Sequence, residues 1–286
     1  MSTAVTSTAT SRGEQVLADT RRTHRAARRA NRLFLLTTRL AIVAVVVAGW
    51  ELASGEVVRP FFVSSPSAIA EQVGDWVTSG ELWYHGRFTV TAAFLGYVFG
   101  ALGGVLVAWP LGLARAAHRI VEPYFLVAYS VPAVAMGPVF ILWFGIGLTP
   151  KVLIAAYFVF FIVFVNTVAG FHQVPSGLLD VTRVMGASRS ARFRTVMLPS
   201  ALPYVLAALR ITLPAAMIGA VTGEFISANR GLGFLTRDAA ARFSSAGVLA
   251  GVLCLSVIVL LMNLLLRPLR HALRWQRQRI DLTTAT

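Results

Sequence analysis

Charge is scarce in this sequence. Only 13% of its 286 residues are charged, 56% are hydrophobic, and the mean hydropathy is +0.70. A soluble domain has roughly a quarter charged residues and about half apolar ones. A water-soluble fold of this length could not hide so much apolar surface, so lipid must cover part of it. The shortage of charge therefore excludes an ordinary soluble domain and predicts an integral membrane protein.

Lysine and cysteine are nearly absent. The single lysine, Lys151, directly follows Thr149 and Pro150, whereas an ATP-binding P-loop requires glycines ahead of its lysine. ATP hydrolysis by that route is therefore excluded, and we predict no catalytic residue and no cofactor bound by this chain. The single cysteine, Cys254, excludes disulfides within the chain and cysteine-ligated metal clusters, and no metal site is predicted.

Two other functional classes lack their usual residues. An intramembrane enzyme needs a Ser–His pair, paired carboxylates or a metal cluster facing one cavity. All five histidines lie at or outside the ends of the apolar stretches. An ion-driven secondary transporter usually shows internal repeats and midplane charges, and neither is evident. Both classes are therefore disfavoured alternatives.

Apolar stretches of membrane-spanning length are abundant. A transmembrane helix needs about 20 mostly apolar residues, and six stretches qualify. They cover about residues 33–53, 88–113, 120–146, 152–171, 204–226 and 248–266. The predicted fold is an all-α polytopic membrane protein with six transmembrane helices. Segment 54–87, rich in proline and aromatic residues, predicts an interfacial helix or a re-entrant stretch.

Positive charge is distributed unevenly across the predicted membrane. The net charge of +14 does not indicate nucleic-acid binding, because the arginines lie between the apolar stretches rather than along one soluble face. With the N-terminus inside, 19 Lys and Arg residues fall on the cytoplasmic side and 6 outside. This bias predicts that both termini are cytoplasmic. We interpret residues 1–32 as a disordered basic cytoplasmic tail rather than a cleaved signal peptide, and residues 269–286 as a C-terminal cytoplasmic tail.

Small residues recur at a helical spacing in the second stretch. Gly96, Gly100 and Gly104 are four residues apart and share one helical face. Small faces let helices approach closely in lipid. We expect this face to pack against another helix of the same chain, with a seam between two copies as the alternative.

Three residues are candidates for a translocation path. Pro132 and Pro138 should kink the third stretch, and kinks are tolerated where neighbours or a cavity satisfy the freed carbonyls. Simple helix packing is the alternative. Glu224 lies near the outer end of the fifth stretch, and intramembrane carboxylates point to function by default. We predict that Glu224 lines the path or an external gate, unless it already lies at the headgroup level.

The cytoplasmic segment between the fourth and fifth stretches is the most informative. Pro175 and Gly177 break the chain just inside the membrane. Asp180 can lie near the start of a short helix, where a carboxylate complements the helix dipole. Gly186 permits a close approach or a sharp bend, and a second amphipathic turn follows. The pattern predicts a helix–bend–helix that projects from the membrane and docks into a groove on a partner protein.

This segment resembles the EAA loop of binding-protein-dependent ABC importer permeases. Asp180-Val181-Thr182 occupies the Glu-Ala-Ala position, Gly186 follows after three residues, and nine more residues lead to Val196 and Leu198-Pro199. The acidic residue is one methylene shorter and both small positions are larger than in the family pattern, whereas the glycine and Leu-Pro keep the family spacing. With its flanking residues, the segment is similar to the nitrate, sulfonate and taurine branch.

The resemblance implies a type I ABC importer permease fold in the bacterial inner membrane. Residues 87–268 would form the permease domain, after a first helix and external segment at 33–86. The partners implied, besides the lipid bilayer, are an ABC ATPase subunit that uses ATP-Mg, a second permease copy in a homodimer, and an external substrate-binding protein. The coupling residues implied are Asp180, Thr182, Arg183, Gly186, Ala187, Val196, Leu198 and Pro199.

The resemblance also indicates a substrate class. The branch points to a small anion such as an aliphatic sulfonate, taurine or nitrate, while similar permeases move pyrimidine precursors or flavins. In the implied cycle, ATP binding closes the ATPase subunits, draws the two loops together and opens the path outward.

Overall fold

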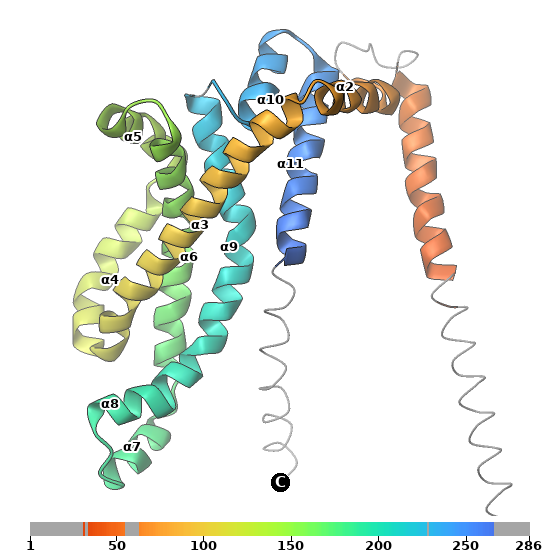
Figure 1. Cartoon of the computed structure of the whole chain (residues 1–286). Coiled ribbons are helices and arrows are strands. Elements are labelled where there is room, and N and C mark those ends of the chain that lie inside the picture. Colours follow the sequence, from red (N-terminus) through yellow and green to blue (C-terminus); the bar gives the residue numbers. More distant parts are fainter. Residues whose placement is uncertain (1–30, 32–33, 55–62, 228, 266–286) are drawn as a thin grey trace, which may run out of the picture. The chain divides into compact units, whose positions relative to one another are not determined.

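The computed structural model describes residues 31, 34–54, 63–227 and 229–265, and every regular element among them is a helix (Figure 1). A first helix at Phe34–Ser54 is followed by α2 (Pro66–Thr78), α3 (Glu81–Leu113), α4 (Arg115–Ser130), the 3₁₀ turn η1 (Ala133–Ala135), α5 (Met136–Phe144), α6 (Leu148–His172), α7 (Ser176–Val184), α8 (Arg189–Arg192), the π segment η2 (Phe193–Met197), α9 (Leu198–Ile226), α10 (Leu232–Ala241) and α11 (Ser245–Leu265). Contacts group the chain into two compact units, Met1–Ser67 and Ala68–Thr286.

Five helices are long and apolar enough to cross a membrane by length and composition. They are Phe34–Ser54, Glu81–Leu113, Leu148–His172, the helical run Arg189–Ile226, and Ser245–Leu264. A bent pair, α4 with η1 and α5, brings the number to six if it forms one broken span. The predicted all-α polytopic fold is confirmed, and the predicted third span is the one that differs most.

The third predicted stretch, 120–146, is not one kinked helix. α4 ends at Ser130, and the helical segment from Ala133 is turned by 74° from it. Val131 is extended, with φ −68° and ψ 122°, because a residue before proline avoids the helical conformation. Pro132 therefore marks a break. Pro138 lies in the first turn of α5, where proline is tolerated, and the bend of this span lies at the break before Ala133 rather than at Pro138.

Helices α3, α6 and α9 pack along one another and form the core of the second unit (Figure 1). The glycines spaced four apart in α3 face α6: Gly96, Gly100 and Gly104. A Cβ at Gly100 would lie 2.5 Å from the carbonyl oxygen of Ala156, so the two backbones approach as closely as glycine allows. α9 approaches α6 just as closely, since a Cβ at Gly219 of α9 would lie 2.5 Å from Ala155 Cα. This glycine face thus packs within the chain.

The first unit is dominated by one exposed helix. Phe34–Ser54 presents most of its apolar side chains at the surface, as a lipid-facing helix would. Glu51 accepts hydrogen bonds from the backbone N–H and the Oγ of Ser67, at 3.0 and 2.6 Å, within this unit. The boundary expected at 86/87 falls inside α3, which begins at Glu81. The predicted tails 1–32, apart from residue 31, and 269–286 lie outside the described residues.

Candidate functional site

The cytoplasmic loop begins with α7, which follows Pro175 and ends at a left-handed glycine. Gly186 has φ +74°, and its N–H donates to the carbonyl of Arg183 at 3.1 Å. The N–H of Ala187 donates to the carbonyl of Thr182 at 3.0 Å. These two bonds form a Schellman motif, which ends a helix and turns the chain. No heavy atom lies within 4 Å of the place a Cβ would take, so Gly186 serves the bend and not a close approach.

The second arm of the loop is continuous with α9. Ser188 Oγ accepts a hydrogen bond from the N–H of Ala191 at 3.1 Å and caps the start of α8. From α8 the chain stays helical through η2 to the end of α9. The N–H of Leu198 bonds back to the carbonyl of Phe193, and this wider turn makes room for Pro199, which would clash with the carbonyl four residues earlier in an α-helix. The second arm is therefore an extension of the fifth span.

α7 has two faces of different character. One face exposes four apolar side chains, 48%, 57%, 88% and 79% accessible in chain order: Leu178, Val181, Val184 and Met185. Residues three and four apart lie on the same side of a helix. Clustered, exposed apolar side chains mark an interaction surface. We call these four residues the apolar face of α7.

The opposite side of α7 borders a cavity. Asp180 and Arg183 lie there and pair with each other, with Arg183 Nη1 3.0 Å from Asp180 Oδ1. Both side chains are more exposed than buried, so the ion pair adds little to stability. The cavity has a volume of about 910 Å³ and lies between α7, the α8–η2 arm and the ends of α3 and α6.

The remaining predicted coupling residues have local structural roles. Thr182 Oγ1 donates to the carbonyl of Leu179 at 2.9 Å, and Val196 is buried. Leu198 and Pro199 form the first turn of α9, and Ala187 follows the glycine bend. The structure thus brings the predicted residues together in one loop. The sequence analysis did not identify the apolar face, although apolar residues three and four positions apart can be recognised in the sequence.

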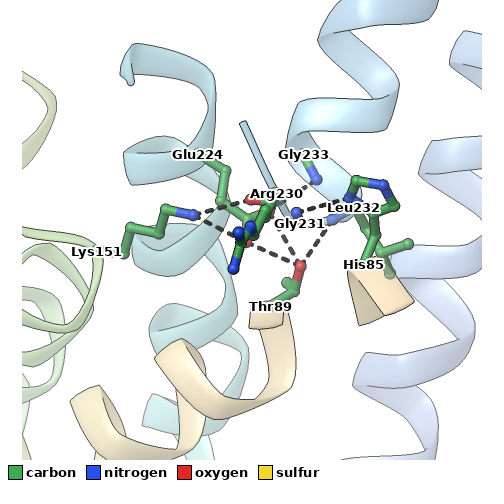
Figure 2. Close-up of polar contacts among 8 residues, drawn as sticks. All are labelled: His85, Thr89, Lys151, Glu224, Arg230, Gly231, Leu232 and Gly233. Atoms are coloured by element: carbon green, nitrogen blue, oxygen red, sulfur yellow. Dashed lines mark hydrogen bonds and ion pairs between the residues drawn. The ribbon is translucent and has the colours of Figure 1, made fainter. Parts of the chain in front are cut away.

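Glu224, the predicted path residue, lies in a buried polar cluster shown in Figure 2. Its side chain is 0% exposed. Thr89 Oγ1 of α3 donates to both carboxylate oxygens, at 2.9 and 3.0 Å, and the N–H of Gly233 donates to Oε2 at 2.8 Å. Lys151 Nζ of α6 lies 4.0 Å from Oε1 and donates to the carbonyl of Arg230 at 2.9 Å. The carboxylate is enclosed in this conformation.

The cluster satisfies the first backbone N–H groups of α10. The N–H of Gly231 donates to His85 Nδ1 at 3.0 Å, and that of Leu232 donates to Thr89 Oγ1 at 2.8 Å. These groups have no partner within their own helix. Side chains of α3 and α9, which are separate elements of the chain, therefore cap α10. A Cβ at Gly231 would lie 2.0 Å from a Glu224 carboxylate oxygen. Glu224 therefore anchors α10 in this conformation, and its place on a translocation path or external gate stays a prediction.

Neither proline candidate for the path reaches the polar cluster. Pro132 lies at the break after α4 and Pro138 in the first turn of α5, and both are exposed. Within the described part of the chain, no three His, Cys, Asp or Glu side chains gather closely enough to hold a metal ion.

Comparison with known proteins identifies the family to which this bundle of apolar helices belongs. Residues 100–275 match the family described as "Binding-protein-dependent transport system inner membrane component". A Bacillus subtilis permease named for aliphatic sulfonates transport is 31% identical over 83% of this chain and 87% of its own length. The taurine transport permease of Escherichia coli is 30% identical over 81% and 86%, and the riboflavin transport permease of Chloroflexus aurantiacus is 33% identical over 76% and 81%.

Solved structures show the same fold. A chain of the MetNI methionine ABC transporter in an inward-facing conformation superposes with a TM-score of 0.53 at 22% identity, covering 68% of this chain and 96% of that one. The chain therefore belongs to the binding-protein-dependent transport system inner membrane component family. It is the permease subunit of an ABC importer, in the sulfonate and taurine branch, and a multi-pass protein of the bacterial inner membrane.

Proposed function

We propose that the apolar face of α7 is the surface by which this permease couples to a separate ATPase subunit. The observation that carries the proposal is the exposure of four apolar side chains on one side of a nine-residue cytoplasmic helix. An amphipathic helix that lays its apolar face into a groove is a common mode of recognition between proteins. The Schellman turn at Gly186 ends this helix and the Ser188 cap starts α8, so together they set the angle at which α7 is presented.

In this proposal the energy source lies on another chain. ATP-Mg binds the ATPase subunit, a second copy of this permease completes the translocation path as a homodimer, and an external binding protein delivers the substrate. Closure of the ATPase subunits draws the two α7 helices together. Because the α8–η2 arm continues into α9, movement of the loop is transmitted directly to a membrane-spanning helix.

The proposed substrate is a small anion such as an aliphatic sulfonate, taurine or nitrate. Relatives named for aliphatic sulfonates and taurine support it. Relatives named for riboflavin and formylaminopyrimidine, at 33% and 29% identity, keep a flavin or pyrimidine precursor as the second candidate. Uptake of labelled taurine and of labelled riboflavin, compared in cells with and without this permease, decides between the two classes.

Docking is tested by co-purification of the ATPase from native membranes in mild detergent. The Val184→Asp variant places a charge on the most exposed position of the apolar face, and we expect it to lose the ATPase while still inserting in the membrane. Val77→Asp changes an exposed valine of α2, on the predicted external side, and should retain the ATPase. Equal recovery of the ATPase in both variants would remove α7 as the docking element. If a preparation free of ATPase still transports solute when an ion gradient is the only energy source, the chain would instead be a secondary transporter.

A further inference from the structure

The cavity behind α7 lies on the side away from the apolar face. Its lining comes from the last turn of α3 and the residue after it, the end of α6, the inner side of α7, and the α8–η2 arm. α3 and α6 are membrane-spanning helices that end here. The cavity therefore lies at the predicted cytoplasmic ends of two candidate membrane-spanning helices, beside the proposed coupling helix.

The polar part of the cavity is cationic. Three arginines line it, Arg183, Arg189 and Arg192, against one acidic side chain, Asp180. Because Asp180 pairs with Arg183, its charge is already matched. Arg192 Nε is buried and has no hydrogen-bond partner among the residues that the structure describes. A buried donor left without a partner costs free energy, so an acceptor entering the cavity would be favoured.

The remaining wall is apolar and aromatic. Trp109 stacks on Phe193 with ring centroids 4.7 Å apart, and Phe171, Leu113 and Met197 complete this wall. Tryptophan is enriched at membrane interfaces, where one side of the ring is wet and the other apolar. A volume of about 910 Å³ exceeds what one inorganic ion would fill. The cavity thus suits a ligand with an anionic head and an apolar continuation.

We propose that this cavity binds the phosphate headgroup of an anionic phospholipid from the cytoplasmic leaflet. Arg189 and Arg192 hold the phosphodiester oxygens, and the wall formed by Trp109 and its neighbours holds the glycerol and the first part of the acyl chains. Basic pockets between membrane helices on the cytoplasmic side recognise such headgroups. The bound lipid contacts α7 on the side opposite its apolar face and stabilises its position. The content of anionic lipid in the leaflet therefore affects how well α7 binds the ATPase. This last step rests on the proposed docking function, whereas lipid binding does not.

Lipid binding is measured on the full chain alone. The chain is purified from nanodiscs of mixed phosphatidylglycerol and phosphatidylcholine, and lipids that remain bound are counted by native mass spectrometry. Arg189→Gln/Arg192→Gln removes the two cationic groups, and we expect retention of phosphatidylglycerol to fall about tenfold relative to phosphatidylcholine. Arg189→Lys/Arg192→Lys keeps both charges and should recover much of the selectivity. Arg194→Gln, an exposed arginine of the same segment outside the cavity lining, should leave it unchanged.

Two outcomes would overturn the proposal. One is equal retention of phosphatidylglycerol in the Gln double variant and the Arg194→Gln control, provided both elute as folded protein on size exclusion. The other is displacement of phosphatidylglycerol by millimolar inorganic phosphate, which would assign the site to a soluble anion. The coupling step has its own readout, since ATPase recovery should fall in nanodiscs without anionic lipid. If α7 does not dock the ATPase, the number of bound lipids is unaffected. Failure of the docking proposal can therefore be told apart from failure of the lipid-binding proposal.

Discussion

At the scale of single residues, Gly186 and Glu224 are constrained in different ways. Gly186 has open space around it but a left-handed backbone, whereas Glu224 has an ordinary helical backbone and no free space. The first constraint was readable from the sequence, because a glycine in a bend is a local property. The second was not, because Thr89 lies 135 residues from Glu224 along the chain. Sequence alone therefore singled out Glu224 near the outer end of the fifth stretch, but it did not reveal the partners that enclose the side chain.

Replacing Gly186 tests the bend without disturbing packing. Gly186→Ala places a Cβ on a backbone with φ +74°, at a cost of about 1 kcal/mol, but creates no clash. We expect the variant to insert normally and to bind the ATPase more weakly, because the last turn of α7 frays. Gly177→Ala, in the same helix and equally open, should bind as well as the unchanged chain. Titration of ATPase onto each variant in nanodiscs measures the difference, and identical affinities would show that the bend does not set coupling.

Replacing Glu224 separates an anchor from a path residue. Glu224→Gln leaves Lys151 buried opposite a neutral group, and breaking a buried pair in this way costs about 3 kcal/mol. We expect a lower unfolding temperature in detergent, partly restored in Lys151→Met/Glu224→Gln because the uncompensated charge is gone. If transport kinetics change while the unfolding temperature does not, Glu224 would instead act in the translocation path.

At the scale of elements, the length of the apolar stretches predicted the candidate spans. It did not predict a break between two helices where the sequence stays apolar. Segment 120–146 reads as one apolar stretch, yet Val131 and Pro132 divide it into two helices inclined at 74°. The motif likewise does not separate the two faces of α7, and the coupling role that the resemblance implies for Asp180 and Arg183 stays a prediction. Their side chains border the cavity because of helix rotation, which a linear motif does not encode.

The contact between α3 and α6 gives an element-scale prediction. Gly100→Ala would bring a Cβ to 2.5 Å from the backbone oxygen of Ala156, which cannot rotate away. Overpacking of this kind costs about 1 to 3 kcal/mol, and we expect a clear fall in the unfolding temperature measured in detergent. Gly86→Ala, in the same helix with open space around it, is the matched control and should be neutral. Similar unfolding temperatures for both variants would mean that the helices separate easily at this point.

At the scale of the whole molecule, orientation in the membrane was inferred from charge alone, since a helix bundle has no intrinsic inside and outside. The bias of arginines toward one set of loops places the α7–α8 loop in the cytoplasm and the α2–α3 turn outside. Both proposals above depend on this orientation, because an ATPase and the anionic leaflet lie on the cytoplasmic side.

The single cysteine makes the orientation directly testable. In a Cys254→Ser background, Ser79→Cys between α2 and α3 and Arg194→Cys in η2 each provide one exposed thiol. A membrane-impermeant maleimide added to intact spheroplasts should label Ser79→Cys and should label Arg194→Cys only after permeabilisation. The unsubstituted chain is the control for the buried Cys254, which is 7% exposed and should react slowly. The reverse labelling pattern would place α7 outside the cell, where it could meet neither an ATPase nor the anionic leaflet, and both proposals would fall together.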